Sequence, residues 1–291
     1  MVQLSFFSFT NFVRRLPFYL IVLVCIEVSA FGQRGRGPVA SSLGGAGVAS
    51  LQAVEGAFFN PAAIASAENN HVSIHGSQEE LNGVDYKDWG FYAIDSGSGS
   101  IAKGAFSYQK SEQDGPGLRS STSRWEISGA KYLIPGLALG TAFTKQTDRD
   151  LINETEKVEY NLDLGALYNF DPSLSAGLLL ENAFTGKDDR QQPLFTAGME
   201  YRLGSVFRYL AETNKVFKAD SQWNYAVGVE LKATDSTSYR LGYLGDKENN
   251  RNYYTGGFSW QGPRLGIYYA FQSGVGDSAE TLHSLDFRVF F

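Results

Sequence analysis

The chain has 291 residues and a net charge of −6, and its mean hydropathy of −0.21 is too low for a bundle of transmembrane helices. No basic block is present, so nucleic acid is not expected as a partner. Aromatic residues make up 14% of the chain, more than a soluble domain ordinarily needs but suited to a membrane barrel with two aromatic girdles.

Residues 1–30 are predicted to be a secretory signal peptide. Arg14 and Arg15 form the positive flank, Leu16–Ile26 is the apolar run, and Val28–Ala30 is a small-residue cleavage site. The apolar run is short for a spanning helix, which disfavours the alternative of an uncleaved anchor. Cys25 lies inside this run, so the mature chain is expected to contain no cysteine, and lipid attachment at Cys25 is disfavoured because the preceding residue is not small.

Residues 31–69 are expected to form a separate N-terminal unit. They begin as a glycine-rich, locally basic tail and continue with small apolar residues that do not alternate in polarity. Such residues let a backbone pack closely inside another structure. Pro61 restricts Asn60 to extended or turn geometry, and a short helix is predicted over residues 62–67.

From residue 70 to residue 291 the sequence predicts membrane strands. Apolar and polar residues alternate over 160–170, 195–201 and 225–231, and a strand of 9–11 tilted residues suffices to cross a bilayer. The last ten residues alternate most cleanly, and they predict a closing strand whose apolar residues also serve as the signal for the barrel-assembly machinery, namely Phe287, Val289 and Phe291.

The predicted connections alternate between long polar loops and short turns, as expected for an outer-membrane barrel. Counting them predicts an all-β, antiparallel transmembrane barrel of about fourteen strands with both ends in the periplasm of a Gram-negative-type bacterium. The weakest assignment is 205–212, where Arg208 interrupts a run of mixed polarity. Without that strand the count falls by two.

The small-residue segment carries a family resemblance. Its glycine- and alanine-rich patch, aromatic pair and Asn-Pro-Ala motif resemble the N-terminal signature of the FadL/OmpP1/TodX superfamily of outer-membrane barrels. The resemblance implies that this segment folds into the lumen as a hatch. The hatch residues that match are Gly44, Gly45, Gly47, Phe58, Phe59, Asn60, Pro61 and Ala62.

The chain is shorter than FadL transporters proper, and its predicted loops are polar. In this it looks more like the compact PorV and PorQ type barrels, for which the family suggests partner binding. Two function classes therefore stay open. One is a transporter for hydrophobic or amphipathic small molecules such as lipids or fatty acids. The other is a non-transporting component that holds a secretion-system or surface protein. Outer-membrane lipid is a partner in both.

Charged residues on the polar faces of the strands are expected to point into the lumen, because a basic residue facing lipid near the midplane costs about 2–4 kcal/mol. They are Glu126, Asp163, Glu200, Glu230, Arg240, Asp286 and Arg288. A polar pathway and a buried ionic network that holds the hatch are both compatible with them, and the network is favoured. Ten strand glycines, which often fall on the polar faces, are interpreted as making room for the hatch.

Enzymatic activity, a metal site and a cofactor are not expected. His71, His75 and His283 come from the first and last strands, which are neighbours in a closed barrel, so the three side chains could approach one another. No acid or oxyanion donor accompanies them in a recognisable motif.

Overall fold

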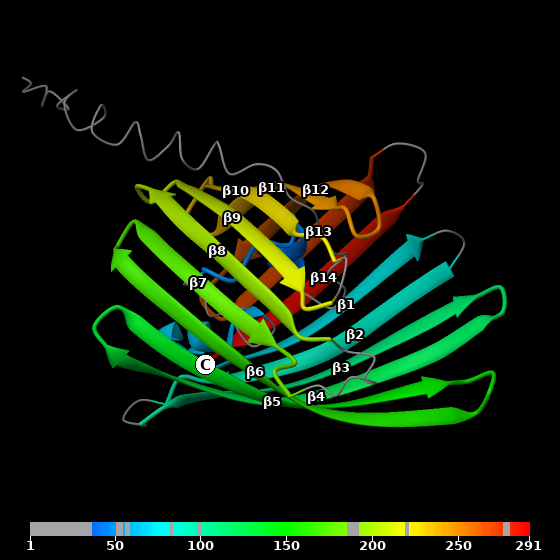
Figure 1. The fold of residues 1–291 in the computed structure, drawn as a ribbon. Helices are drawn as coiled ribbons and strands as arrows, with labels where there is room; N and C mark the ends of the chain where they lie inside the picture. The colour runs from blue at the N-terminus through cyan, green and yellow to red at the C-terminus, as the bar shows by residue number, and fades with distance from the viewer. Residues whose placement is uncertain are drawn as a thin grey trace, which may run out of the picture.

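Within the residues that the structure describes, fourteen antiparallel strands close into a barrel (Figure 1). The structure is a computed structural model, and it describes residues 37–50, 55, 59–81, 84–97, 101–184, 192–218, 221–275 and 280–291. The predicted signal peptide and Phe58 lie outside these residues. The strands are β1 (His71–Leu81), β2 (Val84–Asp95), β3 (Lys103–Gly115), β4 (Leu118–Ile134), β5 (Leu137–Asp150), β6 (Thr155–Asp171), β7 (Leu174–Glu181), β8 (Leu194–Leu203), β9 (Phe207–Val216), β10 (Asn224–Lys232), β11 (Thr237–Asp246), β12 (Arg251–Gln261), β13 (Leu265–Gly274) and β14 (Thr281–Phe290).

Each strand pairs with its neighbours in sequence, and β14 pairs with β1 to close the ring. The amide of Phe291 donates to the carbonyl of Asn70 at 2.9 Å, so both ends of the barrel sequence meet at one rim, called here the terminal rim. The other end is called the opposite rim. The predicted fourteen-stranded barrel is confirmed, including β9, whose mixed polarity arises because Arg208 points inward and is only 5% exposed.

Alternation along the strands separates an apolar outer face from a polar inner face. Ile127 and Leu241 are 63% and 66% exposed on the outside, whereas Glu200 on the inside is 1% exposed. Aromatic side chains on the outer face contact one another across strands, with ring centroids 4.4 Å apart for Tyr108 and Trp125. A closed sheet with such an outer surface has no free edge and suits a lipid environment.

Three of the long polar loops expected from the sequence, over residues 76–87, 111–121 and 146–155, are instead largely strand, which corrects that part of the sequence analysis. β3 and β4 are joined by residues 116–117 only, and β5 and β6 by residues 151–154. Backbone pairing continues beyond the apolar zone although both faces of the strands become polar there. The loss of alternation in these regions therefore marked the edge of the apolar belt and not the end of the strands.

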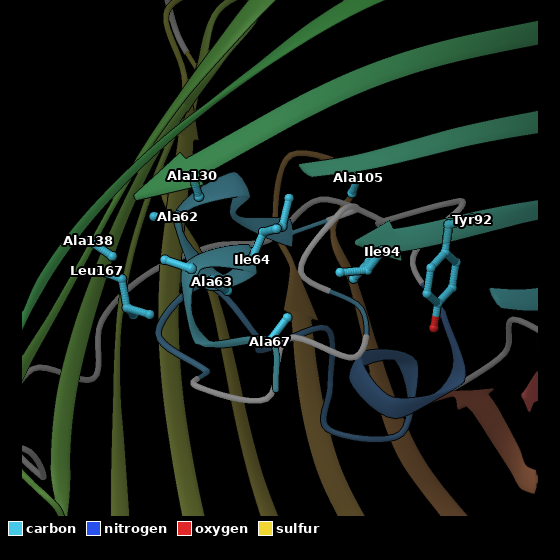
Figure 2. Packing of buried hydrophobic residues seen from close by; sticks show 11 residues of the cluster. Ala62, Ala63, Ile64, Ala67, Tyr92, Ile94, Ala105, Ala130, Ala138 and Leu167 are labelled. Atoms are coloured by element: carbon cyan, nitrogen blue, oxygen red, sulfur yellow. The ribbon is translucent and has the colours of Figure 1, made fainter. Parts of the chain in front are cut away.

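The described residues between 37 and 67, called here the N-terminal segment, contact the inner faces of the strands. It contains the short helix α2 (Pro38–Ser41) and the 3-10 helix η2 (Pro61–Ser66), which Figure 1 draws in blue inside the barrel. No helix among the described residues is long and apolar enough to span a membrane. Figure 2 shows Ala62, Ala63 and Ile64 packed against wall residues that include Ala130 and Leu167.

Candidate functional site in the barrel lumen

Barrel side chains bind backbone groups of the N-terminal segment. One carboxylate oxygen of Glu212 accepts hydrogen bonds from the amides of Gly47 and Val48 at 2.8 and 2.9 Å. The hydroxyl of Thr255 accepts from the amide of Gly44 at 2.9 Å. These bonds satisfy donors that would be costly to bury alone. They also require no particular side chain on the segment, which explains how glycines can occupy these positions.

Asn60 is fully buried and connects three parts of the lumen. Its Oδ1 accepts from the amide of Ala62 at 3.0 Å, so Asn60 caps η2, and Pro61 occupies the first helical position. Its Nδ2 donates to the carbonyl of Val48 at 2.8 Å and to the carbonyl of Ala166 on β6 at 3.1 Å. The Asn-Pro pair therefore fixes the helix to the segment and to the wall.

The segment turns sharply at Gly44 and Gly45, whose φ angles of 71° and 89° lie in the left-handed region that favours glycine. Gly47 faces the buried ring of Phe59, and a Cβ at Gly47 would lie 3.2 Å from that ring. The small residues of the segment thus have two roles, since they permit the turn and they allow close packing.

Inner-face glycines of the wall face the segment directly. In the described part of the chain, a Cβ at any of seven of them would come within 3.0 Å of the segment: Gly140, Gly165, Gly177, Gly198, Gly228, Gly242 and Gly257. Gly104 and Gly129, which belong to the same predicted set, have their nearest neighbours at 3.7 Å, and their strand positions alternate with those of the buried inner-face residues. The interpretation of strand glycines as space for the segment therefore applies to these seven.

A Gly177→Val substitution tests this packing. Its Cβ would overlap backbone atoms of Val48 and Ala49, which cannot rotate away as a side chain could. We expect the free energy of unfolding to fall by about 1–3 kcal/mol or more and the segment to be released from the wall. Release is measured as faster proteolytic cleavage within residues 37–67 of the detergent-solubilised protein. Gly129→Val is the matched control, and it should leave the rate of cleavage nearly unchanged. Equal cleavage rates in both variants would contradict the packing role of Gly177.

The seven predicted luminal charges are all buried, and the structure divides them among three clusters. In the first, Arg124 of β4 donates to Glu126 at 3.1 Å and to Asp163 of β6 at 2.9 Å. Arg124 was not among the predicted residues, although its position two residues before Glu126 puts it on the same polar face. One guanidinium thus lies between two buried carboxylates.

The second cluster is a chain of alternating arginines and glutamates near the terminal rim. Arg202 pairs with Glu200 at 2.7 Å, and Arg208 lies 3.5 Å from Glu200 and 3.3 Å from Glu230. Arg240 completes the chain with Nε 2.5 Å from Glu230. Glu200, Glu230 and Arg240 were predicted from the sequence. Arg202 and Arg208 were missed, although the two-residue period of their strands places both on the polar face.

The third cluster lies at the seam between β1 and β14. Arg288 is fully buried, donates to Asp286 at 2.8 Å and lies over the ring of Tyr268 with 4.1 Å between its guanidinium carbon and the ring centroid. Asp286 also accepts a hydrogen bond from Ser73 of β1. Glu55 of the N-terminal segment is 3.9 Å from Arg288.

Glu55 was missed by the sequence analysis, although a single acid in an apolar, small-residue stretch is a usable signal. Its carboxylate accepts hydrogen bonds from the amides of Val39 and Ala40 at 2.9 and 3.1 Å. Burial raises the pKa of Glu55 to about 7, against the opposing attraction of Arg288. The docked segment thus holds this proton more tightly than a solvated chain does.

Little space remains between the segment and the wall beside it. The cavity lined by Leu43, Phe59 and Arg208 has a volume of about 20 Å³, which is the space of about one water molecule. A larger cavity of about 380 Å³ opens at the terminal rim between Ser66–Asn69 and the wall. Beside Leu43, the space left between the segment and the wall is therefore no larger than a water molecule.

The three histidines do not converge, which corrects the expectation that they could. His71 and His75 are buried on the inner face of β1, whereas His283 lies outside, where its ring nitrogen is 2.8 Å from the hydroxyl of Tyr269. The side chains of β14 alternate, so His283 points away from the lumen. Among the described residues, no group of three or more His, Cys, Asp or Glu side chains could hold a metal ion.

The geometry defines a closed β-barrel with an N-terminal segment bound inside it, and this is the fold of known outer-membrane hydrocarbon channels. The chain is similar in structure to the CymD monoaromatic hydrocarbon channel (TM-score 0.74, 14% identity, 90% of this chain and 99% of that chain covered). It is also similar to the Ralstonia pickettii toluene transporter TbuX (TM-score 0.70, 13% identity, 91% of this chain and 99% of that chain covered). A third similar structure is a Pseudomonas aeruginosa FadL homologue (TM-score 0.63, 11% identity, 91% of this chain and 99% of that chain covered). No family model matches the sequence, and comparison with curated proteins finds no match.

Proposed function

We propose that this protein is an outer-membrane barrel that takes up hydrophobic or amphipathic small molecules, with the N-terminal segment as a movable hatch. The observation that carries the proposal is the segment itself, which is held by a few hydrogen bonds to side chains and by small-residue packing inside a barrel of the hydrocarbon-channel fold. Those bonds can break and re-form without unfolding the wall.

The proposal includes orientation and partners. The terminal rim faces the periplasm, as expected when both ends of an even-stranded barrel lie on one side. Phe287, Val289 and Phe291 are exposed on the outside, by 48%, 42% and 77%, in agreement with contacts to lipid and to the barrel-assembly machinery. A non-catalytic role agrees with two of the similar structures, which are named as a hydrocarbon channel and as a toluene transporter.

A disulfide lock tests whether the hatch must move. The Cγ1 atom of Val48 lies 2.7 Å from the point that a Cβ at Gly198 would occupy, so the side chains of Val48→Cys and Gly198→Cys would be adjacent, as a disulfide requires. Once residues 1–30 are removed, the chain offers no competing cysteine. We expect oxidation to abolish toluene uptake into proteoliposomes and reduction to restore it.

Each single-cysteine variant serves as a control and should be insensitive to oxidant. Undiminished toluene uptake by the fully oxidised double variant would refute hatch movement. Absence of uptake by the unmodified protein, when compared with empty liposomes, would refute the transport proposal as a whole.

A further inference from the structure

One strand of the barrel continues far beyond the end of its neighbour. β6 contains 17 residues and β7 only 8, and their pairing ends at Leu164 and Leu180. Residues 155–163 of β6 lie beyond this last pair, although β5 pairs with β6 as far as Thr155. Figure 1 shows the hairpin of β5 and β6, in green, reaching past the shorter strands at the opposite rim. Among the described strands, this stretch of β6 therefore has a neighbour on one side only.

The backbone of this stretch presents hydrogen-bonding groups to the side that lacks a strand. The amide of Ala183 donates to the carbonyl of Leu162 at 2.8 Å, so the backbone groups of Leu162 face away from β5. Alternate residues of a strand direct their N–H and C=O groups to the same side. Glu156, Val158 and Tyr160 therefore face that side as well, where the described residues place no strand against them. Residues 155–161 are called here the free edge.

The side chains along the free edge are apolar on the outside, and their charges are already paired. Val158 and Tyr160 are 41% and 57% exposed on the outer face. Glu156 lies 2.7 Å from an arginine of β5, and Glu159 lies 2.6 Å from a lysine of β6. No proline interrupts the free edge. An exposed edge of this kind is a template for pairing with another chain.

We propose that the free edge binds an extended segment of a partner polypeptide, which adds to the barrel sheet as a strand. A polypeptide backbone presents donors and acceptors at the spacing of a strand, which a lipid or a small solute does not. Val158 and Tyr160 select apolar residues at alternate positions of the partner segment. In the orientation proposed above, the free edge lies on the outer side of the membrane, so the partner is a polypeptide at the cell surface.

A second copy of this chain does not fit the free edge within one membrane. Two copies in the same membrane are related by an axis along the membrane normal, and the strands of such barrels tilt by about 35–45°. Their β6 strands would cross at about twice the tilt, or about 70–90°, whereas paired strands differ in direction by only about 20–25°. The partner is therefore a different polypeptide.

Amide hydrogen exchange, followed by NMR of the detergent-solubilised protein, tests the free edge. In the protein alone, the amides of Val158 and Tyr160 should exchange fast, whereas the amide of Glu159, which faces β5, should exchange slowly. Addition of the capped peptide Lys-Thr-Val-Thr-Val-Thr-Lys should slow exchange at Val158 and Tyr160 by about tenfold or more and leave Glu159 unchanged. The same peptide with proline in place of both valines is the matched control and should have no effect.

A variant of the protein removes the donor at the centre of the free edge. Val158→Pro deletes an amide that does not bond β5, and proline is tolerated on edge strands, so the peptide should no longer protect Tyr160. Val158→Thr keeps the amide and should behave as the unmodified protein does. If Val158→Pro fails to fold, the comparison of the two peptides decides.

Three results would overturn the proposal. Slow exchange of Val158 and Tyr160 in the protein alone would mean that its own chain or a second copy covers the free edge. Absence of protection by the valine peptide, or equal protection by both peptides, would mean that the free edge does not accept a strand. The inference is independent of solute uptake, because the free edge is not part of the lumen.

Discussion

Deletion of residues 39–65 is expected to leave an inserted barrel that conducts ions much better than the intact protein. A barrel of fourteen strands is wider than the eight-stranded barrels whose own side chains fill the interior, so removal of the segment leaves a water-filled passage. Single-channel recording in planar bilayers measures the change. The wall retains its pairing, because β1–β14 closure involves residues 71–80 and 281–290 only.

The oxidised disulfide variant is the matched control for this deletion, since its wall differs only at residue 198 and the segment is held in place. It should show the low conductance of the intact protein. If the deleted protein inserts and gives the same trace as the intact protein, the segment does not close the lumen, and the hatch proposal fails.

Arg288→Met is expected to destabilise the folded barrel more than any surface substitution. Removal of the guanidinium leaves Asp286, which is fully buried, without its ion-pair partner, and a broken buried pair costs about 3–5 kcal/mol. The loss of stability is measured by gel electrophoresis after heating. The variant should change from the mobility of the folded barrel to that of the unfolded chain at a lower temperature.

The double variant Asp286→Asn with Arg288→Met isolates the cause. It removes both charges, and replacement of a complete buried pair is often close to neutral, so most of the lost stability should return. A double variant as unstable as the single one would show that packing of Arg288 against Tyr268, and not its charge, is what stabilises the seam.

Much of the wall could be predicted from the sequence, because lipid on one side and a polar lumen on the other impose a two-residue period on every strand. This period predicted the strand count and the inward direction of residues such as Glu200. It disappears where water bathes both faces, so the hairpin between β3 and β4 was interpreted as a loop. Pairing there depends on backbone hydrogen bonds, which leave no hydrophobic pattern in the sequence.

The lumen could be predicted only in part. The small residues of the N-terminal segment indicated close packing, but which wall positions they meet depends on how the segment is folded within the barrel. The contact of Glu212 with the amides of Gly47 and Val48 joins residues far apart in the sequence. The grouping of seven charges into three clusters likewise follows from the register between strands, which alternation along a single strand does not determine.

The seam between β1 and β14 also has a consequence for the order of events during biogenesis. β14 follows the other thirteen described strands in the sequence, and its inner face carries Asp286, which accepts a hydrogen bond from Ser73 of β1, and Arg288, which lies 3.9 Å from Glu55 of the segment. Arg288 already pairs with Asp286 of the same strand, so the ring can close with these charges compensated, and Glu55 adds a second, more distant interaction when the segment lies inside. We expect chains lacking Glu55 to close the ring more slowly but completely, so that loading of the interior assists completion of the barrel without being required for it.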